Sequence, residues 1–280
     1  MNTNNGLHKI KIWKLLLWLL LWITVGDVIF ALIQVPLNYP FHIYVYTGVG
    51  LWLYIQFKKY NISFSHLTSK PSFSIPELVK VFGVVVVIKA ASFASVLVLW
   101  NVIGLISPSF LSGVTDEIMQ SSANQESSGV ISIYFVLVVI IAPFIEELLF
   151  RGVLLNNWCK RLGTLAGVIL VSLTFAIFHG PSGFLSALLA SIFFSILYLK
   201  TKSIWIPMAA HSFSNLLSFL IQYVPFQNGT PSVDDHTESL LLMKSLGVYS
   251  GVALLVILLF VIVIFYKMYP RRSHLPYRFY

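Results

Sequence analysis

Eight runs of about 20 predominantly apolar residues divide the chain, and they limit its fold more than any other feature of the sequence. A helix needs roughly 20 such residues to cross the hydrocarbon core of a bilayer, so each run predicts one transmembrane helix. The mean hydropathy of +0.85 and the 58% share of hydrophobic residues exceed those of soluble domains. We therefore predict an all-α, polytopic membrane helix bundle with spans at residues 15–34, 41–57, 80–106, 130–150, 162–179, 184–199, 204–224 and 246–266.

The distribution of charge predicts the orientation of these spans. An even number of spans places both termini on one side of the membrane, and loops rich in Lys and Arg remain in the cytoplasm. We expect cytoplasmic termini in a multi-pass integral membrane protein, which would lie in the cell membrane if the source is bacterial. The net charge of +8 comes from these loops and does not indicate nucleic acid binding. The basic residues of this side are Lys9, Lys11, Lys14, Lys58, Lys59, Lys70, Lys80, Lys160, Arg161, Lys200, Lys202, Lys267, Arg271, Arg272 and Arg278, and the acids of the opposite loops are Asp116, Glu117, Glu126, Asp234, Asp235 and Glu238.

Three charged side chains, Glu146, Glu147 and Arg151, lie at the end of the fourth apolar run. A charge in hydrocarbon costs about 2.5–3.5 kcal/mol, which indicates function rather than packing. Adjacent residues of a helix point about 100° apart, so the two glutamates are expected to have different roles and not to share one small site. Arg151 follows Glu147 by four residues and predicts an ion pair with it, which leaves Glu146 to face a cavity. The alternative is one packing network of all three.

Further polar groups occur in the fifth and seventh spans. His179 directly precedes Gly180-Pro181, and His211 and Asn215 share a helical face because four residues separate them. Polar side chains inside a membrane need polar partners, so we expect these groups to gather with Glu146 in one water-filled pocket. Counted at about 1.5 Å per residue from the basic loops, Glu146, His179 and His211 lie roughly 20, 25 and 10 Å deep. Their convergence would need broken or tilted helices, for which the candidate positions are Pro143, Gly180-Pro181 and Pro207.

A carboxylate, two imidazoles and a carboxamide favour hydrolysis of an amide bond by activated water. Glu146 would take a proton from water, His179 would orient that water, and His211 with Asn215 would donate hydrogen bonds to the oxyanion. Glu146, His179 and His211 could instead bind zinc with water as the fourth ligand. Because the spacing is not His-Glu-x-x-His, we favour the metal-free mechanism, and the cofactor stays open between none and zinc. The single cysteine, Cys159, excludes a disulfide framework and a thiolate metal site.

The order and spacing of these residues resemble the motifs of the CPBP family, which comprises type II CAAX prenyl endopeptidases and bacterial Abi proteins of bacteriocin processing and self-immunity. The resemblance covers about residues 130–224 and implies an intramembrane endopeptidase. It implies that Glu146 and His179 activate water and that His211 and Asn215 stabilise the oxyanion. The implied substrates are membrane-associated, lipid-modified or small precursor peptides. The matching motifs are Glu-Glu-x-x-x-Arg at Glu146, Glu147 and Arg151, Phe-x-x-x-His at Phe175 and His179, and His-x-x-x-Asn at His211 and Asn215, with Glu147, Arg151 and Phe175 in supporting roles.

We accordingly divide the chain into an N-terminal membrane region at 1–129, a catalytic core at 130–224, and a region at 225–280 that holds a loop, the last span and a basic tail. The expected partners are membrane lipid and a peptide or protein substrate, and the oligomeric state stays open. Two alternatives remain: a non-catalytic bacteriocin self-immunity or scaffold protein, and a proton-coupled transporter. We detect no inverted repeat, which would favour the transporter.

Two further charges, Asp27 in the first span and Lys89 in the third, lie near mid-membrane by the same count. We predict a neutralising ion pair between them, and the alternative is that one of them lines the aqueous cavity.

Overall fold

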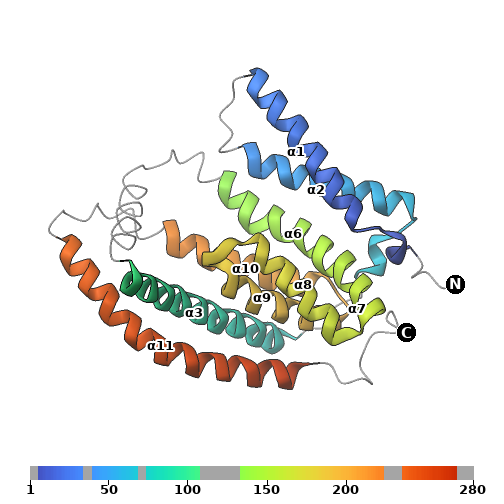
Figure 1. Cartoon of the computed structure of the whole chain (residues 1–280). Coiled ribbons are helices and arrows are strands. Elements are labelled where there is room, and N and C mark those ends of the chain that lie inside the picture. The colour runs from blue at the N-terminus through green and yellow to red at the C-terminus, as the bar shows by residue number, and fades with distance from the viewer. Residues whose placement is uncertain (1–5, 34–39, 69–73, 108–132, 224–234, 270–280) are drawn as a thin grey trace.

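The computed structural model describes residues 6–33, 40–68, 74–107, 133–223 and 235–269, and within these ranges the chain is helical (Figure 1). Each of the eight expected spans coincides with a helical segment. The fourth is one continuous helix over Ile133–Leu162, in which two π-helical segments flank α6. Thr68 and Ser203 form an isolated bridge, and no strand occurs in the described ranges. The elements are η2 (Leu7–Lys9), α1 (Trp13–Ile33), α2 (Pro40–Lys59), η3 (Phe64–His66), α3 (Ile75–Ile106), η4 (Leu137–Ile141), α6 (Ala142–Glu147), η5 (Leu148–Leu155), α7 (Asn156–Leu162), α8 (Thr164–Phe178), α9 (Gly180–Thr201), α10 (Trp205–Tyr223) and α11 (Asp235–Met268).

Five helices among the described residues are long and apolar enough to cross a membrane. The other three expected spans are helical but shorter or more polar. α8 has only 15 residues, α10 carries His211 and Asn215, and α2 ends in Lys58 and Lys59. The acidic residues expected on the exterior face lie outside the described side chains. The five candidates are Trp13–Ile33, Ile75–Ile106, Ile133–Leu162, Gly183–Thr201 and Tyr249–Met268.

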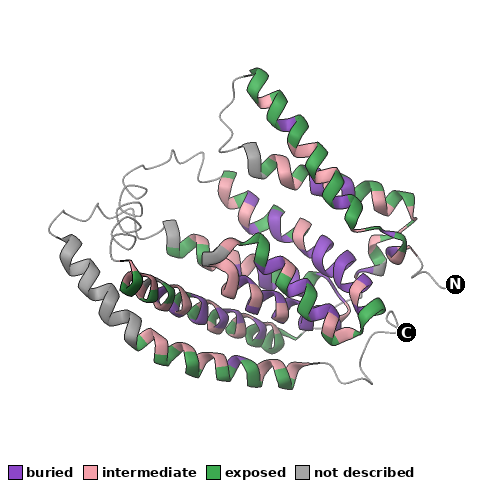
Figure 2. Cartoon of the chain, viewed as in Figure 1, coloured by how far each residue is buried: buried purple, intermediate pink, exposed green. Residues whose placement is uncertain are grey.

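The bundle is built around α9. This helix packs against α8, α10 and α3, while α1 pairs with α2 on one side and α11 packs along α3 on the other (Figure 1). α6 contacts both α2 and α10, so it lies between the α1–α2 pair and the centre of the bundle. Buried residues concentrate in the central helices, whereas α1 and the described side chains of α11, residues 249–268, are mostly exposed (Figure 2). The exposed side chains of these outer helices include Leu16, Leu20 and Leu259, as expected for a surface in contact with lipid.

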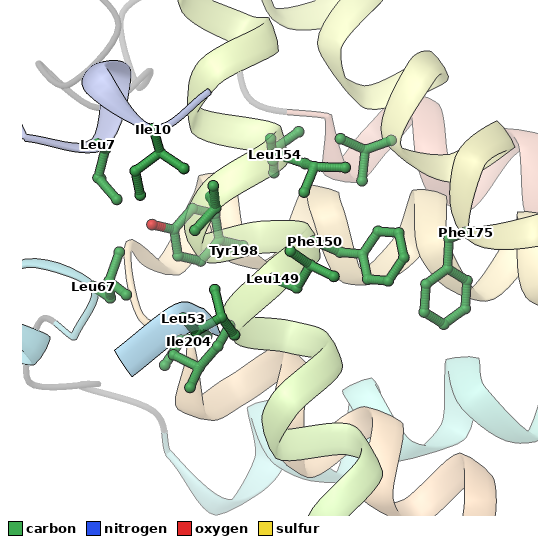
Figure 3. Packing of buried hydrophobic residues seen from close by; sticks show 14 of the residues in the cluster. Leu7, Ile10, Leu53, Leu67, Leu149, Phe150, Leu154, Phe175, Tyr198 and Ile204 are labelled. Atoms are coloured by element: carbon green, nitrogen blue, oxygen red, sulfur yellow. The ribbon is translucent and has the colours of Figure 1, made fainter. Parts of the chain in front are cut away.

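Two apolar clusters hold the helices together. One joins the N-terminal segment, α2, η5 and α8 to the turn between α9 and α10, and Figure 3 shows Leu7, Leu67, Leu154 and Ile204 in this cluster. The second joins α3, α9, α10 and α11. Ser203 and Ile204 of the α9–α10 turn are buried, and the Ile204 N–H donates to the Leu67 carbonyl at 3.1 Å. The start of α10 is therefore packed against the segment that follows α2.

The predicted ion pair between Asp27 and Lys89 is wrong. Lys89 Nζ instead donates to Ser218 Oγ of α10 at 2.6 Å, and no salt bridge joins it to Asp27. The two residues lie in different parts of the bundle. Asp27 is exposed on α1, which packs against α2, whereas α3 packs against α9, α10 and α11. Two charges at similar depth therefore do not imply that their helices are neighbours.

Candidate active site

Pro143 and Asn215 together determine the backbone that precedes the two glutamates. In the π-helical segment η4 the Ala142 N–H bonds to the Leu137 carbonyl, five residues back. The next bond of this kind would join residue 143 to the Val138 carbonyl, but proline has no N–H. Asn215 Nδ2 of α10 donates to that carbonyl at 2.9 Å. A side chain of one motif therefore satisfies the carbonyl that Pro143 leaves without a backbone donor, and it fixes α10 against the helix that carries Glu146.

Glu147 and Arg151 form the predicted ion pair, which is fully buried. Arg151 Nη1 lies 2.8 Å from Glu147 Oε1, and both side chains are 0% exposed. The other terminal nitrogen, Nη2, donates to Ser191 Oγ of α9 at 2.8 Å and to the Ser191 carbonyl at 3.2 Å. The guanidinium also lies over the rings of Phe175 and Phe194, at 5.1 and 5.4 Å. Several partners thus compensate the charge of Arg151, which ties η5 to α8 and α9.

His211 lies between the two glutamates. Its Nδ1 is 2.9 Å from Glu147 Oε1, and its Nε2 is 3.8 Å from Glu146 Oε2. The imidazole ring stacks on Phe194 at 5.1 Å and meets the edge of Phe175 at 5.7 Å. The expectation that adjacent glutamates cannot serve one small site is wrong, because the two nitrogens of one imidazole reach both carboxylates from α10. The predicted difference between their surroundings is present, since Glu147 is fully buried and Glu146 is 15% exposed.

Glu146 has a second partner that the motifs do not contain. Tyr46 of α2 donates its Oη hydrogen to Glu146 Oε1 at 2.6 Å, across 100 positions of sequence. The other oxygen, Oε2, is buried and receives no hydrogen bond from a described residue. A tyrosine within an apolar span needs a partner for its hydroxyl, and this was the only signal in the sequence that could have drawn attention to Tyr46.

The α1–α2 pair holds Tyr46 in place. The Trp18 and Trp22 indoles donate to the carbonyls of Gly48 and Tyr44, both at 2.9 Å. A Cβ at Gly48 would lie 2.4 Å from the Trp22 ring, so glycine permits this close approach of the two helices. The register of α2 beside Glu146 is therefore set by aromatic packing outside the motif region.

His179 joins the site through Phe175. It ends α8, where its ring Nδ1 lies 2.7 Å from the Phe175 carbonyl, which requires a proton on Nδ1; in the neutral ring Nε2 is then an acceptor. Its ring packs on the Phe175 ring at 4.3 Å, and Phe175 in turn contacts His211. Contacts between side chains thus connect all the motif residues except Asn215, whose bond goes to the Val138 carbonyl, and the contacts of His179 run through Phe175. Within the described ranges, no three His, Cys, Asp or Glu side chains converge closely enough to hold a metal ion. The conditional ligand set of Glu146, His179 and His211 does not fit zinc in this geometry, and no step below uses a metal.

An apolar crevice opens beside Glu146. It encloses about 440 Å³ between α2 and the helix of η4 and α6, and the Tyr46 side chain forms part of its wall. Its lining is otherwise aliphatic apart from Thr47, and it consists of Ile43, Tyr46, Thr47, Ile133, Val136, Leu137, Ile141 and Ile145. The crevice can therefore take apolar chains rather than charged groups.

Comparisons with known proteins show which sequences this chain resembles. Residues 128–217 match the model of the family described as Rce1-like, type II CAAX prenyl endopeptidase, and this stretch contains every motif residue named above. A curated relative, "Putative membrane peptidase YdiL" of Bacillus subtilis (strain 168), is 26% identical over 143 residues. That match covers 47% of this chain and 59% of the relative. No solved structure gives a significant match. The chain is a multi-pass integral membrane protein, and its residues 128–217 are similar to the Rce1-like type II CAAX prenyl endopeptidases, a family of peptidases.

Proposed function

We propose that the chain is an intramembrane endopeptidase in which Glu146 activates water. The observation that carries this proposal is the asymmetric environment of the Glu146 carboxylate. Tyr46 holds Oε1, whereas Oε2 is buried, has no described donor and faces His211 Nε2 at 3.8 Å. One oxygen is therefore positioned while the other is free to accept a proton, as a general base requires.

The neighbouring residues take distinct roles in this mechanism. Glu147 and Arg151 are positioning residues, because the Glu147 carboxylate accepts from His211 Nδ1 and so orients the ring. When both ring nitrogens of His211 carry a proton, Nδ1 donates to Glu147 and Nε2 can donate toward the reacting carbonyl. Asn215 uses one amide hydrogen on the Val138 carbonyl, and its second hydrogen remains for the oxyanion. His179 Nε2 accepts a hydrogen bond from the attacking water.

The reaction then follows the usual course of amide hydrolysis. The water oxygen attacks the carbonyl carbon as Glu146 takes the water proton, and the His211 and Asn215 hydrogens stabilise the resulting oxyanion. Collapse of the tetrahedral intermediate breaks the C–N bond, and Glu146 returns the proton to the leaving amine. The products are one carboxylate and one amine.

The substrate we propose is a membrane-associated or lipid-modified peptide. The crevice between α2 and α6 supports this, since its aliphatic wall would receive an apolar segment or lipid chain beside Tyr46 and Glu146. We also propose the finer topology: about eight helices embedded in the membrane, three of them shorter or more polar, with both termini in the cytoplasm.

Replacement of Glu146 by glutamine tests the proposal. Purified protein in proteoliposomes is given a farnesylated CAAX peptide, its unmodified counterpart and a pool of membrane peptides, and mass spectrometry follows new termini. Cleavage by the native chain and its loss in Glu146→Gln are expected. Glu77→Gln is the matched control, because Glu77 is an exposed carboxylate that caps α3 through Ser74, and glutamine keeps that cap. Equal cleavage by Glu146→Gln and the native chain would refute the mechanism.

A further inference from the structure

A second cavity lies far along the same helix from Glu146, where the start of the described chain meets α7. It encloses about 310 Å³ and is lined by Ile10, Lys11, Ile12, Trp13, Trp158 and Arg161. A hydrogen bond and buried apolar side chains hold the two segments that form its walls together. Asn157 Nδ2 of α7 donates to the Leu7 carbonyl at 3.0 Å, and Leu7 and Ile10 are buried in the apolar cluster (Figure 3). We call this cavity the basic interface pocket.

The charge of the basic interface pocket is uncompensated. Lys11 and Arg161 are exposed, the lining contains no carboxylate, and neither residue takes part in a salt bridge within the described ranges. A positive field extends to its neighbours as well. Burial, followed by the charges of Lys160 and Arg161, lowers the pKa of His8 below its ordinary value. Two unpaired cations at the rim of a formed cavity favour an anionic ligand.

The remaining lining residues indicate where this anion comes from. Trp13 begins α1, a candidate membrane span, and it is 55% exposed, while Trp158 lies opposite on α7. Exposed tryptophans at the end of a span mark the level of the lipid headgroups, and Ile10 and Ile12 add apolar wall. Basic pockets between helices at this level bind phosphate-bearing headgroups.

We propose that the basic interface pocket binds the phosphodiester of an anionic phospholipid. Lys11 and Arg161 contact the phosphate, and Trp13 and Trp158 lie along the glycerol and the first carbons of the acyl chains. This site is separate from the proposed catalytic cluster, so the proposal stands or falls independently of the peptidase activity. Inorganic phosphate shares the anionic group but lacks the acyl chains, and the experiment separates the two.

The test is native mass spectrometry of the full chain in detergent, titrated with dioleoyl phosphatidylglycerol or dioleoyl phosphatidylcholine. We expect tighter adducts with phosphatidylglycerol, and about 30-fold weaker binding of it by Lys11→Gln/Arg161→Gln, since each cation contributes on the order of 1 kcal/mol. Lys58→Gln/Lys59→Gln is the matched control, because it removes two exposed charges at the end of α2 that do not line the pocket. Lys11→Arg/Arg161→Lys keeps both charges and is expected to retain binding.

Three outcomes would overturn the proposal. Equal binding of the two lipids would show that the phosphate charge is not recognised. An equal loss in Lys58→Gln/Lys59→Gln would show a diffuse effect of surface charge. Displacement of phosphatidylglycerol by equimolar inorganic phosphate would show that free phosphate is the ligand. Thermal unfolding of each variant, checked in parallel, separates lost binding from lost folding.

Discussion

Removal of Arg151 is expected to destabilise the chain strongly, because it leaves the Glu147 carboxylate buried without its cation. Both side chains are 0% exposed, and Arg151 is also bonded to Ser191. Breaking a buried pair by removing one partner costs about 3–5 kcal/mol, so Arg151→Met should lower the unfolding midpoint by roughly 6–20 °C. The single cysteine suits the assay, since Cys159 is only 3% exposed and a thiol-reactive fluorophore reports its release on unfolding.

A double-mutant cycle shows whether the lost stability comes from the unpaired charge. Arg151→Met/Glu147→Gln removes both charges and should be more stable than Arg151→Met by about 1–3 kcal/mol. Arg161→Met is the control, because this arginine is exposed and forms no salt bridge with a described residue. If Arg151→Met melts at the temperature of Arg161→Met, or if the second substitution brings no recovery, the account of the buried pair is refuted.

Three further predictions follow from individual contacts. Tyr46→Phe removes the hydrogen bond to Glu146. Because hydrogen bonds to charged groups contribute about 1.5–3 kcal/mol, kcat/KM for peptide cleavage should fall roughly 10- to 150-fold with folding intact. An unchanged rate would show that Tyr46 does not act on Glu146. Asn215→Leu should lower the free energy of unfolding by about 1–3 kcal/mol, measured by thermal unfolding. Adding Pro143→Ala to the same chain should recover part of this stability by restoring a backbone N–H. If the two substitutions lower stability additively, the pairing of Asn215 with the Val138 carbonyl is contradicted. Gly167→Ala places a Cβ 2.7 Å from a backbone nitrogen of α7, and the overpacking should lower stability by about 1–3 kcal/mol, whereas Gly83→Ala, with open space around it, should not.

The sequence predicted those features that depend on local spacing. Apolar runs gave the positions of the helices, and the i,i+4 spacing gave the Glu147–Arg151 pair, which is confirmed. The family resemblance is confirmed by the match over residues 128–217. The catalytic roles of Glu146, His179, His211 and Asn215 stay predictions, as do the three regions of the chain.

Features that depend on the packing of distant helices were not predictable. Counting depth from the basic loops placed Glu146 and His211 at different levels of the membrane, yet His211 Nε2 lies 3.8 Å from Glu146 Oε2. The count assumed that each helix starts at the membrane surface, whereas the residue before α10, Ile204, is bonded to Leu67 in the segment after α2. The same count suggested the absent Asp27–Lys89 pair. The bond from Asn215 to the Val138 carbonyl required knowledge of both the π-helical register and the neighbouring helix.

The contact of Tyr46 with Glu146 has a consequence for how proteins of this kind diverge. The matched stretch begins at residue 128, whereas Tyr46 belongs to a helix that precedes it. If Glu146 is the general base we propose, two proteins with identical motifs can therefore work at different rates, because a hydroxyl from outside the matched stretch sets how firmly its carboxylate is held. On the proposed mechanism, moving the motif-bearing segment alone into a similar protein would not transfer its turnover. Exchanging the α1–α2 pair would alter turnover while every motif residue stayed the same.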